Sequence, residues 1–233
     1  MTNTLTANVP AAAKEKGRFA KGFGVLKYGL AAFAALAGEA VIAYGIEQNI
    51  YGVGIENFST PQMILHWVLT CIMWGVCVFF ICRCANNKGH DLFSKNTQKI
   101  KAWQWGCIAL GVCACIATSW IDWEGSKVLK EFAANGALKF VFQYIYYMFE
   151  VSLVTLIIVF GQKACEIWFG RENIPYGGII AALTWGVGHW ASKGSLMAGL
   201  VSAACGLALG SVYLLTNRKT KLSYALLYAM FVL

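Results

Sequence analysis

The segment FVFQYIYYMFEVSLVTLIIVF, residues 140–160, decides the fold class of this chain. Glu150 is its only charged residue, and most of the others are apolar. A helix of about 20 mainly apolar residues is long enough to cross the ~30 Å hydrocarbon core of a bilayer. The segment therefore predicts a transmembrane helix.

Similar segments make up most of the chain. Of its 233 residues, 58% are hydrophobic and 13% are charged, whereas soluble chains have roughly 45–50% apolar and about 25% charged residues. This balance excludes a water-soluble globular protein. We predict an all-α, polytopic helical membrane protein with about six or seven transmembrane helices and a short interfacial helix around Val128–Phe132.

Seven apolar segments are predicted to be helical. They are Val25–Ile46, Met63–Cys84, Trp103–Trp123, Phe140–Phe160 with an alternative end at Phe169, Tyr176–Ala191, Leu196–Leu215 and Leu222–Leu233. The last is shorter than the ~17 residues needed to span, so we expect it to end inside the bilayer or to pack as a half-helix. Residues 1–24 predict a polar, disordered cytosolic tail, and residues 25–233 a single membrane domain.

Lysine and arginine alternate in abundance from one predicted loop to the next. Fifteen lie in the N-terminal tail and in the second, fourth and sixth loops, and four lie in the third and fifth loops. Because basic residues are enriched on the cytosolic side, the N-terminus is predicted to be cytosolic and the C-terminus to lie on the opposite side. The basic residues flank the membrane, so lipids are expected partners and nucleic acid is not.

Five ionisable residues lie inside the predicted spans: Glu39, His66, Glu150, Glu166 and His189. Each is a candidate functional residue, because a charge at the bilayer centre costs at least ~2.5–3.5 kcal/mol. A structural role remains open for four of them: Glu166 could pair with Arg171 or Lys163 at a helix end, and His189 could be an interfacial residue like Trp190. Glu39 lies among small residues that allow another helix to approach and share a hydrogen bond, and His66 lies near a membrane interface.

Two of the glutamates lie on one predicted helix but on different faces. Glu150 and Glu166 are sixteen residues apart, which at ~100° per residue turns them about 160° away from each other. Gln162 and Glu166 are separated by four residues and share a face, with Arg171 one turn further on. We therefore expect Glu166 to belong to a polar cluster on the cytosolic side.

Three motifs follow one another in the last third of the chain. The first is Glu166-Ile-Trp-Phe-Gly-Arg171, the second is Leu183-Thr-Trp-Gly-Val-Gly-His189, and the third is a glycine-rich segment that contains Gly206xxxGly210 and ends at Asn217. In order and type, they resemble the CAAX protease and bacteriocin-processing (CPBP) family of intramembrane endopeptidases. That family carries the motifs EExxxR, FxxxH and HxxxN, and the resemblance covers residues 161–233.

The resemblance implies roles for three residues. Glu166 would activate a water molecule, His189 would position that water or polarise the peptide carbonyl, and Arg171 would be the arginine of the first motif. Gln162, Glu150, Glu39 and His66 are supporting or substrate-binding candidates. The family also implies a multi-pass protein of the cell membrane, of bacterial origin, with a peptide or protein substrate.

The chain departs from the family pattern at several positions. Ile167 stands where the second glutamate is expected, Trp185 where phenylalanine is usual, and the segment Leu222–Leu233 contains neither histidine nor asparagine. Either other side chains, with Glu39, His66 and Glu150 as candidates, replace the missing groups, or the chain is a scaffold that has lost proteolysis.

Three functions remain open on the sequence. The first is a glutamate-dependent intramembrane endopeptidase that cleaves peptide or prenylated substrates at the cytosolic membrane face. The second is a non-catalytic relative that binds a peptide or partner, as in bacteriocin self-immunity, and the third is a small transporter. No nucleotide, haem or HExxH zinc motif is present, so no cofactor and no metal are predicted.

Overall fold

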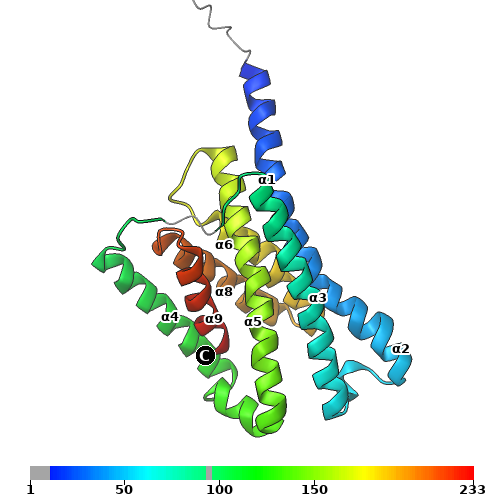
Figure 1. The fold of residues 1–233 in the computed structure, drawn as a ribbon. Coiled ribbons are helices and arrows are strands. Elements are labelled where there is room, and N and C mark those ends of the chain that lie inside the picture. Colours follow the sequence, from blue (N-terminus) through cyan, green and yellow to red (C-terminus); the bar gives the residue numbers. More distant parts are fainter. Residues whose placement is uncertain (1–10, 93–95) are drawn as a thin grey trace, which may run out of the picture.

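The computed structural model describes residues 11–92 and 96–233 of the chain, and within these ranges every regular element is helical (Figure 1). Five of the described helices are long and apolar enough to cross a membrane. They are α1 (Ala11–Ala40), which continues through the π-helix η1 (Val41–Glu47) and α2 (Gln48–Tyr51), α3 (Thr60–Asn87), α4 (Ala102–Asp122), α5 (Lys127–Phe169) and α8 (Leu196–Leu215). The prediction of an all-α polytopic membrane protein is confirmed.

The predicted segment Tyr176–Ala191 is helical but not uniform. It consists of α6 (Tyr176–Ala181), the π-helix η3 (Ala182–Gly186) and α7 (Val187–Lys193). The short C-terminal helix α9 (Thr220–Val232) packs against α5, α8 and α4, as expected for a half-helix. The 3-10 helix η2 (Ile55–Asn57) lies in the connection between α2 and α3.

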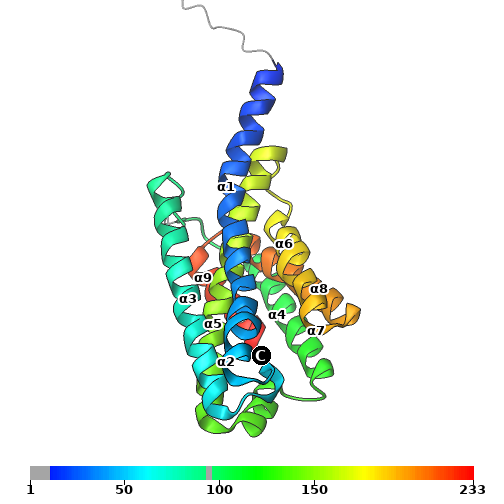
Figure 2. The same ribbon diagram turned by 90° about the vertical axis from the view of Figure 1, so that its right-hand side faces the viewer.

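The N-terminal helix begins earlier than predicted. We expected a disordered tail over residues 1–24; residues 1–10 of it lie outside the described residues, but α1 is already helical at Ala11. The reason is local, because residues 11–16 are alanine, lysine and glutamate, which have high intrinsic helix propensity. The helix therefore extends beyond the apolar segment on the N-terminal side (Figure 2).

A break divides α5 into a short first part and a long second part. Gly136 has φ 67° and ψ 170°, a conformation that only glycine adopts readily. The nine or so residues before this break form the short helix predicted near the interface, and the long part after it is the membrane-spanning helix.

The long part of α5 lies at the centre of the molecule, and packs against α1, α3, α6 and α9 (Figures 1 and 2). Nearly every residue between Glu150 and Cys165 is buried, on all faces of the helix. In contrast, α4 lies at the edge of the bundle, and most of its surface is exposed. The central position of α5 places Glu150 in the interior of the bundle.

The glycines of α8 allow its backbone to lie directly against α6 and η3. A Cβ atom on Gly210 would overlap the backbone of Gly178, and one on Gly206 would lie 2.9 Å from the amide nitrogen of Ala182. Gly206xxxGly210 is therefore a close-packing motif of the small-residue type that is common between membrane helices. This contact holds η3, which carries Trp185, against α8.

Candidate functional site

A cavity of about 1000 Å³ lies between α1, α3, α4, α5, α7, α8 and α9. Its walls combine aromatic rings with ionisable side chains. The ionisable groups that line it include Glu39, Asp122, Lys127, Glu150, His189 and Lys193. An aromatic cavity with a few polar groups is the usual form of a ligand or substrate site.

The cavity lies in the half of the molecule opposite the N-terminus. Tyr44 near the end of the first span, Asp122 at the end of α4, Lys127 at the start of α5 and Lys193 at the end of α7 all line it. These helix ends lie at the opposite end of the bundle from the start of α1 (Figure 2). If the N-terminus is cytosolic, as predicted from the basic residues, the cavity faces the non-cytosolic side.

Glu150 and His189 are joined in this cavity by Trp185. The indole Nε1 of Trp185 donates a hydrogen bond of 3.0 Å to Oε1 of the buried Glu150. Nδ1 of His189 lies 2.8 Å from the carbonyl oxygen of Trp185, and the two rings are in edge contact with centroids 4.6 Å apart. Since a carbonyl oxygen only accepts, Nδ1 of His189 carries the hydrogen, and the neutral ring has its lone pair at Nε2.

Both π-helical segments lie at this cavity. The η3 segment carries Trp185, and η1 contributes Ala43 and Tyr44 to the wall. A π-helical turn widens the helix by one residue, and such turns are frequent at functional sites. The wider turn of η3 lies at Trp185, whose indole points toward Glu150 of α5.

A second polar group lies on the α1 and α3 side of the cavity. Oε1 of Glu39 accepts a hydrogen bond of 2.8 Å from the Tyr146 hydroxyl and lies 3.3 Å from Nε2 of His66. The other ring nitrogen of His66, Nδ1, lies 2.6 Å from Oε2 of Glu47. Glu39 lines the cavity, while His66 and Glu47 are buried behind it.

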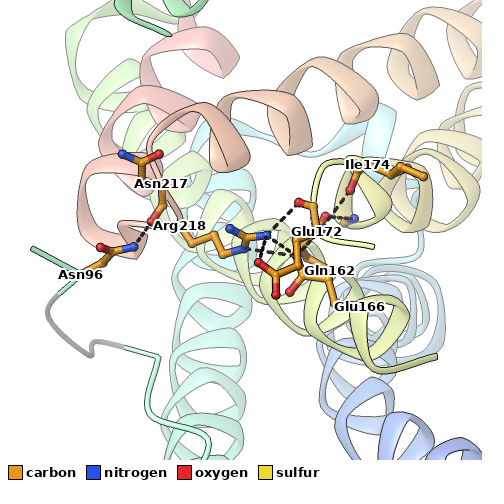
Figure 3. Close-up of polar contacts among 8 residues, drawn as sticks. Asn96, Gln162, Glu166, Glu172, Ile174, Asn217 and Arg218 are labelled. Carbon is orange, nitrogen blue, oxygen red and sulfur yellow. Dashed lines mark hydrogen bonds and ion pairs between the residues drawn. The ribbon is translucent and has the colours of Figure 1, made fainter. Parts of the chain in front are cut away.

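Glu166 lies near the C-terminal end of α5, at the end of the bundle where α1 begins. It precedes Phe169, the last residue of α5, by about one helical turn. Its Oε1 accepts hydrogen bonds from Gln162 Nε2 at 2.6 Å and from Arg218 at 2.6 and 3.2 Å (Figure 3). The neighbouring Trp168 donates a hydrogen bond of 3.1 Å to the Phe19 carbonyl of α1. At 1.5 Å per residue, Glu166 is about 24 Å along the helix from Glu150.

The contacts around Glu166 tie two connections to the end of α5. Gln162 donates from Nε2 to the carbonyl of Ile174 at 2.9 Å and accepts from the amide of Gly177 at 2.9 Å, and Arg218 also donates to the carbonyl of Glu172 at 2.9 Å (Figure 3). The turn after α8 is therefore joined to the connection between α5 and α6. Glu166 is engaged in holding this end of the bundle together.

The predicted contact between Gln162 and Glu166 is confirmed, but Arg218 occupies the position beside Glu166 that we expected for Arg171. Gly170, at φ 65°, ends α5 in the left-handed conformation and turns the chain away, so that Arg171 is exposed. Arg218 reaches Glu166 from the turn after α8, where its own φ is 59°. A sequence pattern along one helix cannot reveal such a partner 52 residues away.

The structure thus brings Glu39, Glu150 and His189 into one cavity and places His66 directly behind Glu39. It does not place Glu166, Gln162 or Arg171 among the residues that line this cavity. Sequence reasoning missed Trp185, Tyr146, Lys127 and Glu47 as cavity or network residues. Glu47 could have been noticed, because it follows the predicted span Val25–Ile46 directly.

In the described part of the chain, no group of three or more His, Cys, Asp or Glu side chains is arranged to hold a metal ion. Comparisons of the chain with protein-family models, with curated proteins and with solved structures find no match. The interpretation of the cavity rests on its residues and their geometry.

The ion pair between Arg218 and Glu166 predicts that substitutions of Arg218 and Arg171 differ in their effect on the free energy of unfolding. We expect Arg218→Gln to lower the free energy of unfolding by about 1–2 kcal/mol, because it removes charged hydrogen bonds to the mostly buried Glu166 carboxylate. Arg171→Gln should change it by no more than about 0.5 kcal/mol, as is usual for an exposed residue. Denaturant titration of both variants in detergent measures the difference, and equal effects would contradict the assigned partner.

Proposed function

We propose that this chain is an intramembrane peptide hydrolase in which Glu150 is the general base and His189 assists it. The observation that carries the proposal is the hydrogen-bonded series Glu150, Trp185 and His189 in one large cavity. Glu150 takes the role that the family resemblance assigned to Glu166. The proposed reaction is the one that the family resemblance implies, but its general base is Glu150 and not Glu166, sixteen residues further along α5.

The geometry supports this chemistry at each group. The Trp185 indole binds Oε1 of Glu150 and holds the carboxylate in place, so that Oε2 is left to take a proton from water. Nε2 of His189 has a free lone pair that can orient the same water. Lys127 and Lys193 line the same cavity and provide positive charge for the oxyanion that develops during attack on a carbonyl.

The walls and position of the cavity indicate the kind of substrate. Aromatic rings of Trp67, Trp74, Tyr146 and Phe231 line it, and its volume suits a ligand of several residues. A short extended segment of a membrane-associated peptide fits this description. Because the cavity lies opposite the N-terminus, we propose cleavage at the non-cytosolic face and not at the cytosolic face, which the sequence had suggested.

A cleavage assay in proteoliposomes tests the proposal. We expect the wild type to cleave a member of a panel of leader-type and prenylated peptides, and His189→Ala to lower kcat by about 10²-fold or more, the usual contribution of a positioned acid–base group. His90→Ala is the matched control. Its imidazole lies beside Tyr28 outside the cavity, where burial and the charges of Lys163 and Lys27 hold its pKa below the ordinary value.

Two outcomes would contradict the proposal. Equal loss in both histidine variants would mean that His189 has no special role. Peptide binding without cleavage by the wild type would favour the non-catalytic alternative, a peptide-binding or self-immunity protein that uses the same cavity.

A further inference from the structure

A second recess, of about 460 Å³, lies between α3 and α5, which pack side by side (Figure 1). Its α3 residues lie between Trp67 and Val76, and its α5 residues are Phe142, Ile145 and Phe149. The three α5 residues follow one another at spacings of three and four, so they share one face of the helix. None of the described residues that line the recess carries a charge. We call this recess the α3–α5 groove.

The floor of the groove is formed where Phe149 lies against Gly75. A Cβ atom on Gly75 would lie 3.0 Å from Cε1 of Phe149, so the missing side chain allows the phenyl ring to approach α3 closely. Beside this contact, Ile72 and Val76 are exposed, and the groove is open to the surroundings. The side chains of α3 and α5 thus leave an apolar space between them unfilled.

The medium around this groove is the hydrocarbon of the bilayer. Both α3 and α5 are long and apolar enough to cross a membrane, and the groove lies within both helices. Atoms that line an unfilled recess lose dispersion contacts on that side. Because lipid chains are as apolar as the side chains themselves, the quality of packing decides what fills such a recess. A flexible hydrocarbon chain can restore the lost contacts.

The length and direction of the groove suit one acyl chain. Trp67 and Val76 are nine residues apart, which corresponds to about 13 Å along α3 at 1.5 Å per residue. The hydrocarbon core of a bilayer is ~30 Å thick, so the chains of one leaflet reach about half of it. The groove follows the axes of two membrane-spanning helices, and acyl chains run in the same general direction.

A positive charge lies at the outer end of the groove. Nζ of Lys139 is 5.9 Å from the centroid of the Trp67 ring. Lys139 precedes Phe142 by three residues and follows the break at Gly136 by three, so it lies where the long part of α5 begins. In the described part of the chain, no carboxylate forms an ion pair with it. This is the place and the charge that a lipid phosphate requires.

We propose that the α3–α5 groove is a binding site for one phospholipid, with an acyl chain in the groove and the phosphate beside Lys139. Trp67 lines both the groove and the large cavity, and on the cavity side its ring centroid is 6.2 Å from that of Tyr146. The bound chain therefore covers the membrane side of the cavity wall. This inference does not depend on the proposed hydrolysis.

Photolabelling in liposomes tests the position of the acyl chain. The probe is phosphatidylglycerol with a diazirine in one acyl chain, present at a low fraction in phosphatidylcholine. We expect labelling of residues 142–149 to fall about threefold or more in Ile72→Trp, because the larger ring takes space in the groove and removes the chain's contacts. Leu69→Trp is the matched control, since Leu69 is exposed on the same helix but does not line the groove.

Gly75→Leu is a second variant for the same experiment. Its side chain fills the floor of the groove from α3, whereas Ile72→Trp changes the exposed edge. A folding defect at the floor therefore leaves the edge variant as a valid test. Labelling at the wild-type level in both variants would mean contact with bulk lipid only and would overturn the proposed site.

Lipid retention in detergent tests the position of the phosphate. By native mass spectrometry, we expect the wild type to retain phosphatidylglycerol about fivefold better than diacylglycerol with the same chains, as is typical of one basic residue at a membrane surface. Lys139→Gln should remove this preference but still retain both lipids. Lys130→Gln, which changes an exposed lysine in the short first part of α5, should keep it.

Two further outcomes would overturn the site. An unchanged preference for phosphatidylglycerol in Lys139→Gln would show that the phosphate lies elsewhere. Unlabelled residues 142–149 in the wild type, together with chemical crosslinks that join two copies of the chain across α3 and α5, would show that a second copy fills the groove. Neither measurement uses peptide cleavage, so failure of the hydrolase function would leave the lipid site standing.

Discussion

We expect Glu150→Gln to abolish the proposed peptide hydrolysis, with a fall in kcat of about 10³-fold or more, and Glu166→Gln to keep kcat within about threefold of the wild type. Glutamine has the shape of glutamate and still accepts the hydrogen bond from Trp185, but it cannot take a proton from water. Glu166 lies about 24 Å away along α5, with its Oε1 bound by Gln162 and Arg218. Initial rates of both variants in proteoliposomes measure the contrast.

Stability provides the control for this experiment. Glu166→Gln weakens the contact to Arg218 and should lower the unfolding midpoint, while Glu150→Gln replaces a buried carboxyl group by a neutral amide and should not. Glu150→Gln should therefore lose activity and keep its stability, whereas Glu166→Gln should lose stability and keep its activity. Loss of activity in Glu166→Gln at unchanged stability would instead support the assignment that the family resemblance implies.

The fold class could be predicted because membrane spans leave a strong signal in a single sequence. Segments such as residues 140–160 must bury a whole helix in hydrocarbon, so their composition alone identifies them. The π-helical turns at Val41–Glu47 and Ala182–Gly186 left no such signal, because both segments are as apolar as their neighbours. A separation between the short helix near Val128–Phe132 and the span that starts at Phe140 was predicted, but not that Gly136 makes it within one continuous element.

The candidate site was predicted only in part, and the reason is the range of its contacts. Placing Glu150 and Glu166 on different faces of one helix needed only the helical repeat, and the structure puts them in different environments. Which of the two shares a cavity with His189 depends on how η3 and α7 pack against α8, and no local pattern contains that information. Glu39 and His66 were selected because they are ionisable residues inside spans, but their contact joins residues 27 positions apart.

Gly210→Leu is expected to disrupt the packing of α8 on α6 and to lower the free energy of unfolding by at least the ~1–3 kcal/mol typical of overpacking. A Cβ atom at this position would overlap the backbone of Gly178, which cannot move aside as a flexible side chain could. The displaced α8 should also release η3 and with it the contact of Trp185 with Glu150, so peptide hydrolysis should fall as well. Denaturant unfolding in detergent measures the first effect and the cleavage assay measures the second.

Gly106→Leu is the matched control, because it makes the same change on an exposed face of α4 where a Cβ atom would meet nothing within 4 Å. It should leave the free energy of unfolding within about 0.5 kcal/mol of the wild type and leave hydrolysis unchanged. Gly210→Ala adds only the Cβ atom and should fall between Gly210→Leu and the wild type. Wild-type stability in Gly210→Leu would contradict the close approach of α8 to α6, and with it the reason why η3 can hold Trp185 against Glu150.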